Sequence, residues 1–395
     1  MDTSTPAAKT SFTADVHFVS RYHRAVVLSG NDSTARILVC PALQGRVLTS
    51  TLDGPDGQSL GYFNHQRIGS QKMYPHSQGY GGEDRFWIGP QGGQYTVFFK
   101  AGAPFDFDHW QTPEAIDREP FEVVNQQDSA ITLKKEMTLT NYSGFTFQLS
   151  VKRTIRTINP QQAQTDLGIA EWGPAIRYVG FESNNTLTNV SDRPWARETG
   201  LLSIWILGQF PAGATVVMPC RDGSGQIPYT TYFRGQTPEL TGAEIKTGAH
   251  AIYYNGNGKA IGKIGLKPGK ATGYFGSYHP DSRVLTIIQY SYRPGDTDYV
   301  NSLWKQQQHP YDGDVINAYN DGALDANAPH TPTFYELESS SATQPLKPGE
   351  QLSHVHRTFH FQGDEAALDR ICESLLGTTI AHIQSQFPNR IKPAK

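Results

Sequence analysis

The sequence is poor in the residue types that define several common classes of protein. Its three cysteines, Cys40, Cys220 and Cys372, are far apart, which excludes a disulfide framework and any cysteine-based metal motif. Charged residues make up 18% of the chain, the net charge is -3, and there is no long basic run. We therefore expect no nucleic-acid partner. No apolar run approaches the roughly 18 residues of a membrane span, so we also expect no span.

The N-terminus, MDTSTPAAKTSF, lacks the basic and apolar segments of a signal peptide. We expect residues 1–14 to be a disordered lead-in. The sequence predicts a soluble protein and leaves its compartment open: periplasmic or secreted if a leader was removed, and otherwise cytoplasmic. It also leaves the oligomeric state open.

The residues that are abundant favour β-structure. The chain has 38 Gly, 19 Tyr and 19 Phe, and short apolar or alternating segments recur between turn signals. In Gly144–Ile158, for example, Phe145, Phe147 and Leu149 share one face of the expected strand. No repeat or low-complexity linker divides the chain. The sequence therefore predicts an all-β fold, one large antiparallel β-sandwich over residues 15–363.

Other local patterns give more specific expectations. Residues 364–395 are expected to form a C-terminal helical segment packed on the sandwich, because Leu368, Ile371, Cys372 and Leu375 have helical spacing behind the N-cap candidate Asp364. We also expect a strand over Gln94–Lys100, a short helix over Val300–Gln308, and a hairpin that pairs Phe334–Ser340 with Gln351–Phe361.

A first candidate site lies in the segment Gly81–Trp87, GGEDRFW. Its glycine pair allows a sharp turn, and Asp84, Arg85 and Trp87 offer hydrogen-bonding groups and a stacking face that suit a sugar. The alternative is a tight β-turn with an ordinary Asp–Arg pair. Downstream, the aromatic and Pro-rich segment that holds His109 and Trp110 is expected to be a loop packed over another part of the fold.

Two carboxylates form a second candidate. Glu336 and Glu338 are two residues apart on an expected strand, so both side chains point to the same face. Their mutual repulsion favours a partner or a raised pKa for one of them, as a general base requires. The alternative is a pair of solvent-facing glutamates.

A third candidate is the His-x-His pattern of His354 and His356 on the neighbouring expected strand. This spacing is common among metal ligands, and a nearby Glu would complete a divalent-metal site. Chance is the alternative in a chain with 13 His.

Two polar segments provide further sugar-binding candidates. Asp321 lies in the loop Pro310–Gly322, which suits sugar hydroxyls or a calcium ion, and a loop held by Asx turns is the alternative. Asn189 lies at an expected strand end ahead of Trp195, and a core position for that tryptophan is the alternative.

These motifs together resemble the galactose-mutarotase-like (aldose 1-epimerase-like) superfamily, and within it an uncharacterised bacterial branch. The likeness extends from His17 to Phe361. It is carried by the motifs Gly82–Pro90 (GEDRFWIGP), Ser203–Gly208 (SIWILG), Tyr319–Gly322 (YNDG) and Phe334–Ser339 (FYELES). The resemblance implies a β-supersandwich carbohydrate-binding domain over residues 15–363, with a mono- or oligosaccharide as the partner.

The resemblance also implies roles for individual residues. The epimerase base is a strand glutamate before a leucine-proline-glycine-glutamate turn, which Glu338 matches because LKPGE follows; Glu336 is the alternate. The epimerase acid is a histidine in an Asn-His-Ser-type motif, and Val190 stands at that position. Because an apolar side chain cannot donate a proton, His76 or His109 would have to replace it.

Three functions follow from these observations. The first is a carbohydrate-active, aldose 1-epimerase-like isomerase with Glu338 as base, Arg85 anchoring the sugar, and Trp87 or Trp110 stacking on its ring. The second is a non-catalytic carbohydrate-binding protein that uses the same cleft. The third is a metal-dependent lyase or hydrolase that acts on a modified sugar through His354 and His356. The first two need no cofactor.

Overall fold

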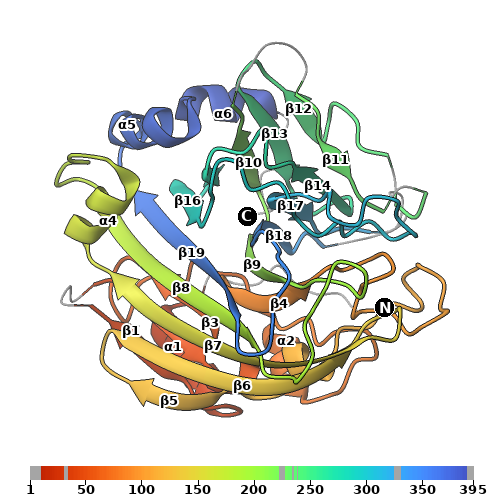
Figure 1. The fold of residues 1–395 in the computed structure, drawn as a ribbon. Helices are drawn as coiled ribbons and strands as arrows, with labels where there is room; N and C mark the ends of the chain where they lie inside the picture. The colour runs from red at the N-terminus through yellow and green to blue at the C-terminus, as the bar shows by residue number, and fades with distance from the viewer. Residues whose placement is uncertain are drawn as a thin grey trace.

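The structure is a computed structural model that describes residues 10–30, 34–221, 227–233, 235–237, 239–323 and 331–388. Two large antiparallel sheets lie face to face, with a small third sheet at the N-terminal end (Figure 1). The fold is therefore the all-β sandwich that the sequence predicts.

The largest sheet has ten strands and curves around one side of the molecule (Figure 1). Buried and exposed side chains alternate along its long strands Ala130–Thr140 and Thr146–Ile158, because one face of the sheet packs inside the molecule and the other meets solvent. In spatial order the strands are β12 (Ile245–Thr247), β13 (Ala251–Gly256), β10 (Ala214–Pro219), β15 (Tyr274–His279), β16 (Val284–Tyr290), β19 (Gln351–Gln362), β8 (Arg177–Asn189), β7 (Thr146–Ile158), β6 (Ala130–Thr140) and β5 (Glu122–Gln126).

The second sheet has six strands, of which five are buried on both faces along nearly their whole length and the two-residue edge strand is half-buried. In spatial order they are β11 (Thr230–Thr231), β14 (Gly262–Leu266), β17 (Ile316–Asn320), β18 (Phe334–Ser340), β9 (Ser203–Pro211) and β4 (Arg85–Gly89). The third sheet consists of β1 (Val26–Ser29), β2 (Arg36–Cys40) and β3 (Arg46–Thr51).

Helices cover parts of the sandwich (Figure 1). The C-terminal pair, α5 (Glu365–Leu376) and α6 (Ile380–Gln386), packs its apolar side on Tyr278, Leu285 and Phe359 of the ten-stranded sheet. Asp364 caps α5 by accepting a hydrogen bond from the Ala367 amide, as the sequence predicts. The remaining helices are α1 (Phe12–Ser20), the single 3₁₀ turn η1 (Pro41–Leu43), α2 (His65–Ser70), α3 (Glu114–Asp117) and α4 (Pro160–Leu167).

The chain termini differ in part from the expectation. Residues 1–9 and 389–395 lie outside the described residues. Within the expected lead-in, however, α1 begins at Phe12 behind the N-cap Ser11. Phe12 is buried against Leu38 and Leu48, so hydrophobic contacts fix a segment that composition alone made look disordered.

Two local expectations are wrong. Gln94–Lys100 is a series of turns, because Thr96 Oγ1 donates to Gln91 O and accepts from the Phe98 amide, which replaces strand pairing with local hydrogen bonds. Val300–Gln308, a fully described range, is an irregular loop with no helix. The aromatic side chains of both segments pack against other parts of the fold, Phe98 on Trp87 and Trp304 on Phe233, so their apolar spacing resembles that of a regular element.

The expected hairpin of residues 334–340 with 351–361 is also wrong. β18 pairs with β17 and β9 in one sheet, whereas β19 pairs with β16 and β8 in the other. The intervening chain crosses from one sheet to the other, so the two strands face each other across the sandwich.

A buried ion pair joins the sheets where they meet. Asp84, directly before β4, accepts a hydrogen bond from Arg153 Nη2 on β7, and both side chains are fully buried. Ser183 Oγ donates to the other carboxylate oxygen at 2.6 Å, and Arg153 Nη1 donates to Asn185 Oδ1 at 2.7 Å. Every charge here has partners, as burial requires.

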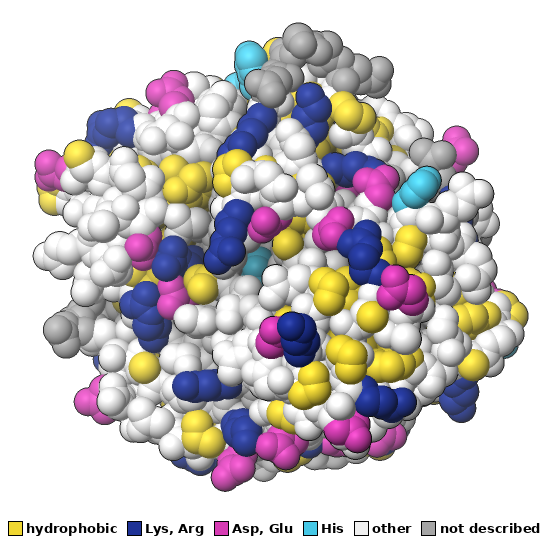
Figure 2. Space-filling view, in the orientation of Figure 1, with side chains coloured by type: hydrophobic (Ala, Val, Ile, Leu, Met, Phe, Trp, Pro, Cys, Tyr) yellow, Lys and Arg dark blue, Asp and Glu magenta, His cyan; other side chains and the backbone are white. Residues whose placement is uncertain are grey.

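The face in Figure 2 shows acidic and basic side chains interspersed on the exterior.

We predict that Asp84→Asn destabilises the protein by about 3–5 kcal/mol, because it leaves the buried Arg153 guanidinium without its counter-charge. Urea unfolding measures the effect. Asp53→Asn is the matched control: Asp53 pairs with Arg177 on the surface, where such a pair contributes about 1 kcal/mol or less. Equal losses in the two variants would contradict a structural role for Asp84.

Candidate functional site

The polar residues of the six-stranded sheet gather on its face away from the ten-stranded sheet. On β18, Glu336 and Glu338 point to this face, while Leu337 and Ser339 point into the sandwich. The register places Glu338 opposite Leu207 of β9 and Glu336 opposite Gln209.

Glu338 is at the centre of this face and is fully buried. Its Oε2 accepts a hydrogen bond from Lys263 Nζ at 2.6 Å and another from Trp205 Nε1 at 2.9 Å. Lys263 also lies over the indole ring of Trp205, 4.4 Å from its centroid. Among the described residues, no donor reaches the buried Oε1 of Glu338. One oxygen is thus held firmly and the other is left for a different partner.

The environment changes the acidity of Glu338. Burial raises its pKa to about 7, the positive charge of Lys263 opposes that rise, and the neighbouring Glu336 adds to it. A carboxyl group with this pKa exchanges its proton near neutral pH, which is the property of a general base or acid.

A second charged group lies beside the first. Arg85 Nη2 donates to Glu336 Oε1 at 3.0 Å, and Gln209 Nε2 donates to the same oxygen at 2.6 Å. The guanidinium lies 4.2 Å from the centroid of the Trp87 ring, which holds it flat against the aromatic face. Arg85 Nε and Gln209 Oε1 are buried without a partner among the described residues.

The glycine pair before β4 makes the sharp turn that leads into Asp84 and Arg85. Gly81 and Gly82 have φ values of 85° and 112°, which side-chain-bearing residues rarely adopt. A Cβ on Gly82 would lie 2.8 Å from the Arg46 side chain and 2.9 Å from Val47 O. The turn therefore requires glycine, and it delivers Asp84 to one face of the sheet and Arg85 to the other.

Aromatic side chains cover the face. Trp87 packs on Phe98, Trp110 and Trp205, with ring centroids 5.2, 6.2 and 5.3 Å away respectively. Trp110 in turn stacks on Trp304 at 6.2 Å. The loop of residues 101–119 thus packs over the sheet, and its Trp110 lies between Trp87 and Trp304.

Several candidate residues lie away from this face. Asn189 Nδ2 donates to Arg193 O and Leu346 O, and so holds a turn beside the ten-stranded sheet. Asp321 follows the end of β17 and accepts from Thr333 Oγ1. His109 is exposed and pairs with Asp106.

His76 lies behind the aromatic cover of the face. Its Nδ1 bonds to Trp110 O at 2.7 Å, so the ring supports the segment that carries Trp110. Among the described residues, His76 forms no hydrogen bond with Glu336 or Glu338.

His354 and His356 face the sandwich interior and bind one hydroxyl group. Each ring nitrogen, Nε2 of His354 and Nδ1 of His356, lies 2.8 Å from Ser339 Oγ. Because Ser339 has one hydroxyl proton, it donates to one ring and accepts from the other. Glu336 and Glu338 point to the opposite face of β18, and the described residues contain no group of three or more His, Cys, Asp and Glu arranged to hold a metal ion.

Three residues of the site were not recognised in the sequence: Lys263, Trp205 and Gln209. Lys263 lies 75 positions from Glu338 in the chain and Trp205 lies 133 positions away, so only the sheet order brings them together. The one local signal is a lysine within a short run of strand-like residues, where a charge needs a buried partner.

Comparison with solved structures identifies the class of fold. The Slr1438 protein from Synechocystis sp. PCC 6803 superimposes with a TM-score of 0.51 at 13% sequence identity, covering 87% of this chain and 96% of its own. A galactose mutarotase-like protein from Lactobacillus casei matches with a TM-score of 0.49 at 11% identity, covering 85% and 100%. At this level of identity the likeness to the Slr1438 protein is one of fold alone, an antiparallel β-sandwich.

Within that class, the chain belongs to the family of unknown function DUF6786, whose model matches residues 10–387. A search of the curated proteins gives no match. In the part of the chain that the structure describes, no helix is long and apolar enough to cross a membrane.

The buried histidines His354 and His356 predict that the folded protein is less stable in acid. Burial lowers the pKa of His354 to about 3 and that of His356 to about 4. The unfolded chain therefore binds more protons than the folded chain from about pH 6.5 downward, so the free energy of unfolding falls as pH falls. Each histidine contributes a slope of up to about 1.4 kcal/mol per pH unit.

We expect His354→Gln to flatten this dependence by the contribution of one histidine. Urea unfolding at intervals from pH 4 to pH 7 measures the slopes of both proteins. His109→Gln, at an exposed position, is the control and keeps the wild-type slope. A His354→Gln slope equal to that of the wild type would show that His354 is protonated in the folded state.

Proposed function

We propose that this protein is a carbohydrate-active enzyme that interconverts the anomers of a sugar, with Glu338 as its general base. The observation that carries the proposal is the pair of Glu338 oxygens. Lys263 and Trp205 hold Oε2, while Oε1 is buried without a donor among the described residues. The galactose-mutarotase-like fold supports a carbohydrate as the substrate class.

The first step is the opening of the sugar ring. Glu338 Oε1 takes the proton of the anomeric hydroxyl, the new C=O bond forms at C1, and the bond from C1 to the ring oxygen breaks. The ring oxygen leaves with the electron pair of that bond and takes up a proton. The product is the open-chain aldehyde, which closes on either face by the reverse steps.

Lys263 is the group that we assign as proton donor to the ring oxygen. The position to which the resemblance assigns the epimerase histidine holds Val190, which is 48% exposed and follows the end of β8 in the other sheet. Lys263 carries transferable protons and is 2.6 Å from Glu338, so the proposed acid and base lie side by side. When the ring closes, the hydroxyl formed from the ring oxygen returns its proton to Lys263, and Glu338 returns its proton to the oxygen at C1.

Arg85 and Trp87 are the groups that we assign to sugar binding. Arg85 is held by Glu336 and by the face of Trp87, and such an oriented guanidinium can donate to sugar oxygens. Its Nε is buried without a partner among the described residues, as is Trp87 Nε1. Buried donors of this kind are satisfied by the hydroxyl groups of a ligand or by water.

We predict that Glu338→Gln lowers turnover by at least about 100-fold and leaves sugar affinity within a few-fold, because the amide keeps the shape of the carboxyl group but cannot accept the proton. Polarimetry of freshly dissolved D-glucose and D-galactose, with and without protein, measures turnover, and calorimetry measures affinity. Wild-type turnover in the variant would exclude Glu338 as the base. Sugar binding without any acceleration by the wild type would identify a non-catalytic binding protein.

The rate is also expected to depend on pH. Since Glu338 acts as the carboxylate, turnover should rise with pH through a midpoint near its pKa of about 7. The positive charge of Lys263 lowers this pKa. Lys263→Met should therefore lower the rate, because the assigned proton donor is lost, and should move the midpoint of the residual rate to higher pH. Lys263→Arg also loses the donor but keeps the charge, so it is the matched control for the midpoint. An unchanged midpoint in Lys263→Met would show that the titrating group is not Glu338.

A further inference from the structure

A cavity of about 300 Å³ lies beside the six-stranded sheet, outside the group of residues assigned to the chemical step. One wall is the segment around β11 and the other is the loop that carries Trp304. Its volume is at the lower end of the range for small-molecule sites. The lining residues are Tyr229, Thr230, Thr231, Phe233, Gln236, Leu303, Trp304 and Lys305.

Two aromatic rings form a corner of the cavity. Phe233 and Trp304 have ring centroids 5.0 Å apart and an angle of 78° between their planes. Phe233 has a φ of 58°, a left-handed conformation that is unfavourable for a bulky side chain. Such strain is retained where the surrounding structure holds a residue in place, and it is concentrated at ligand sites.

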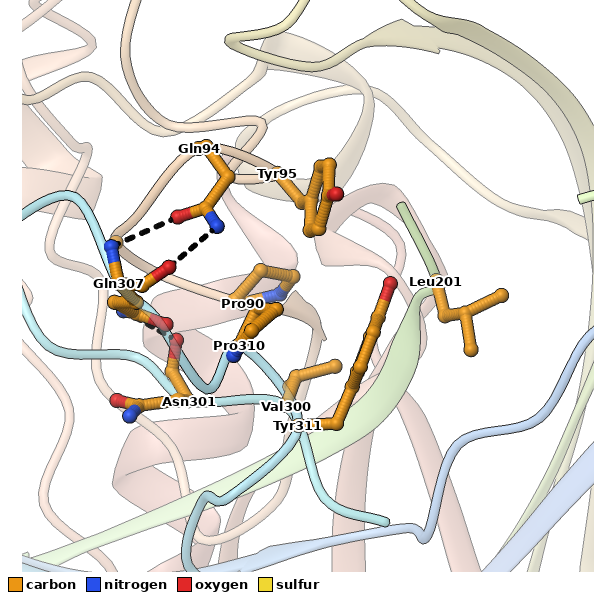
Figure 3. A pocket seen from close by; sticks show the side chains of 10 residues that line it. Pro90, Gln94, Tyr95, Leu201, Val300, Asn301, Gln307, Pro310 and Tyr311 are labelled. Atoms are coloured by element: carbon orange, nitrogen blue, oxygen red, sulfur yellow. Dashed lines mark hydrogen bonds between the residues drawn. The ribbon is translucent and has the colours of Figure 1, made fainter. Parts of the chain in front are cut away.

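The loop that carries Trp304 is fixed at its base (Figure 3). Gln94 Nε2 donates to Gln307 O at 2.8 Å, and the backbone N–H of Gln307 donates to Gln94 Oε1 at 3.1 Å. Gln307 Nε2 also donates to Asn301 O and Leu303 O, at 2.9 and 2.8 Å. These bonds hold Trp304 in position before any ligand binds, which lowers the entropy cost of binding.

A row of indole rings leads from the cavity to the proposed site. Trp304 stacks on Trp110 with centroids 6.2 Å apart, and Trp110 lies 6.2 Å from Trp87, the ring beneath Arg85. The Nε1 donors of Trp87, Trp110 and Trp304 are all buried, and none has a partner among the described residues. Because buried donors are rarely left unpaired, the row is suited to a chain of hydroxyl groups.

A second connection runs through Tyr232. This residue precedes Phe233 in the chain, and its ring centroid is 5.4 Å from Lys263 Nζ. Lys263 in turn binds Glu338 at 2.6 Å. The contacts that lead from the cavity to the proposed base thus run through the side chains of Tyr232 and Lys263.

From these contacts we infer that the cavity is a subsite for a second sugar ring, and that the substrate is an oligosaccharide with a free reducing end. The inference rests on the proposed function, because anomer interconversion at Glu338 requires a free anomeric hydroxyl on the reacting ring. The second ring is therefore linked through another hydroxyl of that ring. The aromatic corner offers it a stacking face, and the side chains of Gln236 and Lys305 at the rim offer polar groups to its hydroxyls.

Calorimetry with a panel of neutral and acidic monosaccharides, and with the disaccharides built from them, tests the inference. We expect at least one disaccharide to bind the wild type about tenfold or more tightly than its own reducing-end monosaccharide. Trp304→Ala should remove that advantage and leave monosaccharide affinity within about twofold. Trp304→Phe, which keeps a ring, should preserve most of it, and Tyr229→Ala should weaken the disaccharide selectively.

Tyr22→Ala provides the control, because Tyr22 is an exposed aromatic residue in a different part of the fold and should change no affinity. Equal disaccharide affinity in Trp304→Ala and the wild type overturns the subsite. An equal loss for monosaccharides and disaccharides also overturns it. If monosaccharides bind and turn over without any disaccharide preference, the subsite alone fails. If no sugar in the panel binds the wild type, the proposed function fails as well.

Discussion

The buried carboxylate of Glu338 imposes the strictest requirement on this fold. A charge that is fully removed from water needs a counter-charge and hydrogen-bond donors at close range. Lys263 and Trp205 supply them from β14 and β9, two strands that are distant in sequence. The order β14-β17-β18-β9 is therefore as necessary to the site as the residues themselves, because any other arrangement would leave the carboxylate without its partners.

The same strand carries a different kind of polar chemistry on its other face. Ser339 points into the sandwich and joins His354 and His356, and nearby Asp84 binds Arg153. These interior groups are closely surrounded by protein and hold the sheets together. Both sets include buried atoms without a protein partner among the described residues: Glu338 Oε1 and Arg85 Nε on one face, and His354 Nδ1 and His356 Nε2 on the other. The two sets differ in their acidity. Burial raises the pKa of Glu338 to about 7, whereas burial lowers the pKa of both histidines and keeps their rings neutral.

The sequence predicted the features that depend on local patterns. The limits of β18 agree with the expected strand, and β7 covers all but the first two residues of the expected Gly144–Ile158. The Asp364 cap is confirmed, and the alternation of β18 places both glutamates on one face. It failed for Gln94–Lys100 and Val300–Gln308, whose aromatic rings pack against other segments although the backbone forms neither strand nor helix. Sheet membership could not be predicted either, since the pairing of β18 with β9 rather than β19 depends on contacts far apart in the chain.

In the candidate site too, the sequence predicted only the residues that have a local signal. Glu338, Glu336, Arg85, Trp87 and Trp110 have local signals and come together in the fold. The one local signal of Lys263, its place in a short strand-like run, does not reveal which residue is its partner. Asp84 shows the converse limit: it is adjacent to Arg85 in a motif that suits a sugar, yet the glycine turn sends it to the opposite face. A carboxylate beside a site residue is thus not itself a site residue when strand alternation separates the two.

The distribution of unpartnered groups also bears on how large a ligand the protein accommodates. A site for one sugar ring needs donors and acceptors only around Glu338 and Arg85. The unpaired indole nitrogens instead continue past Trp110 to Trp304, beyond the groups that we propose to react. The protein also rigidifies the loop that carries Trp304 through Gln307 and holds Phe233 in a strained conformation. Since strain and ordering both cost free energy, their concentration at the cavity is explained more simply by a ligand that extends into it than by packing alone.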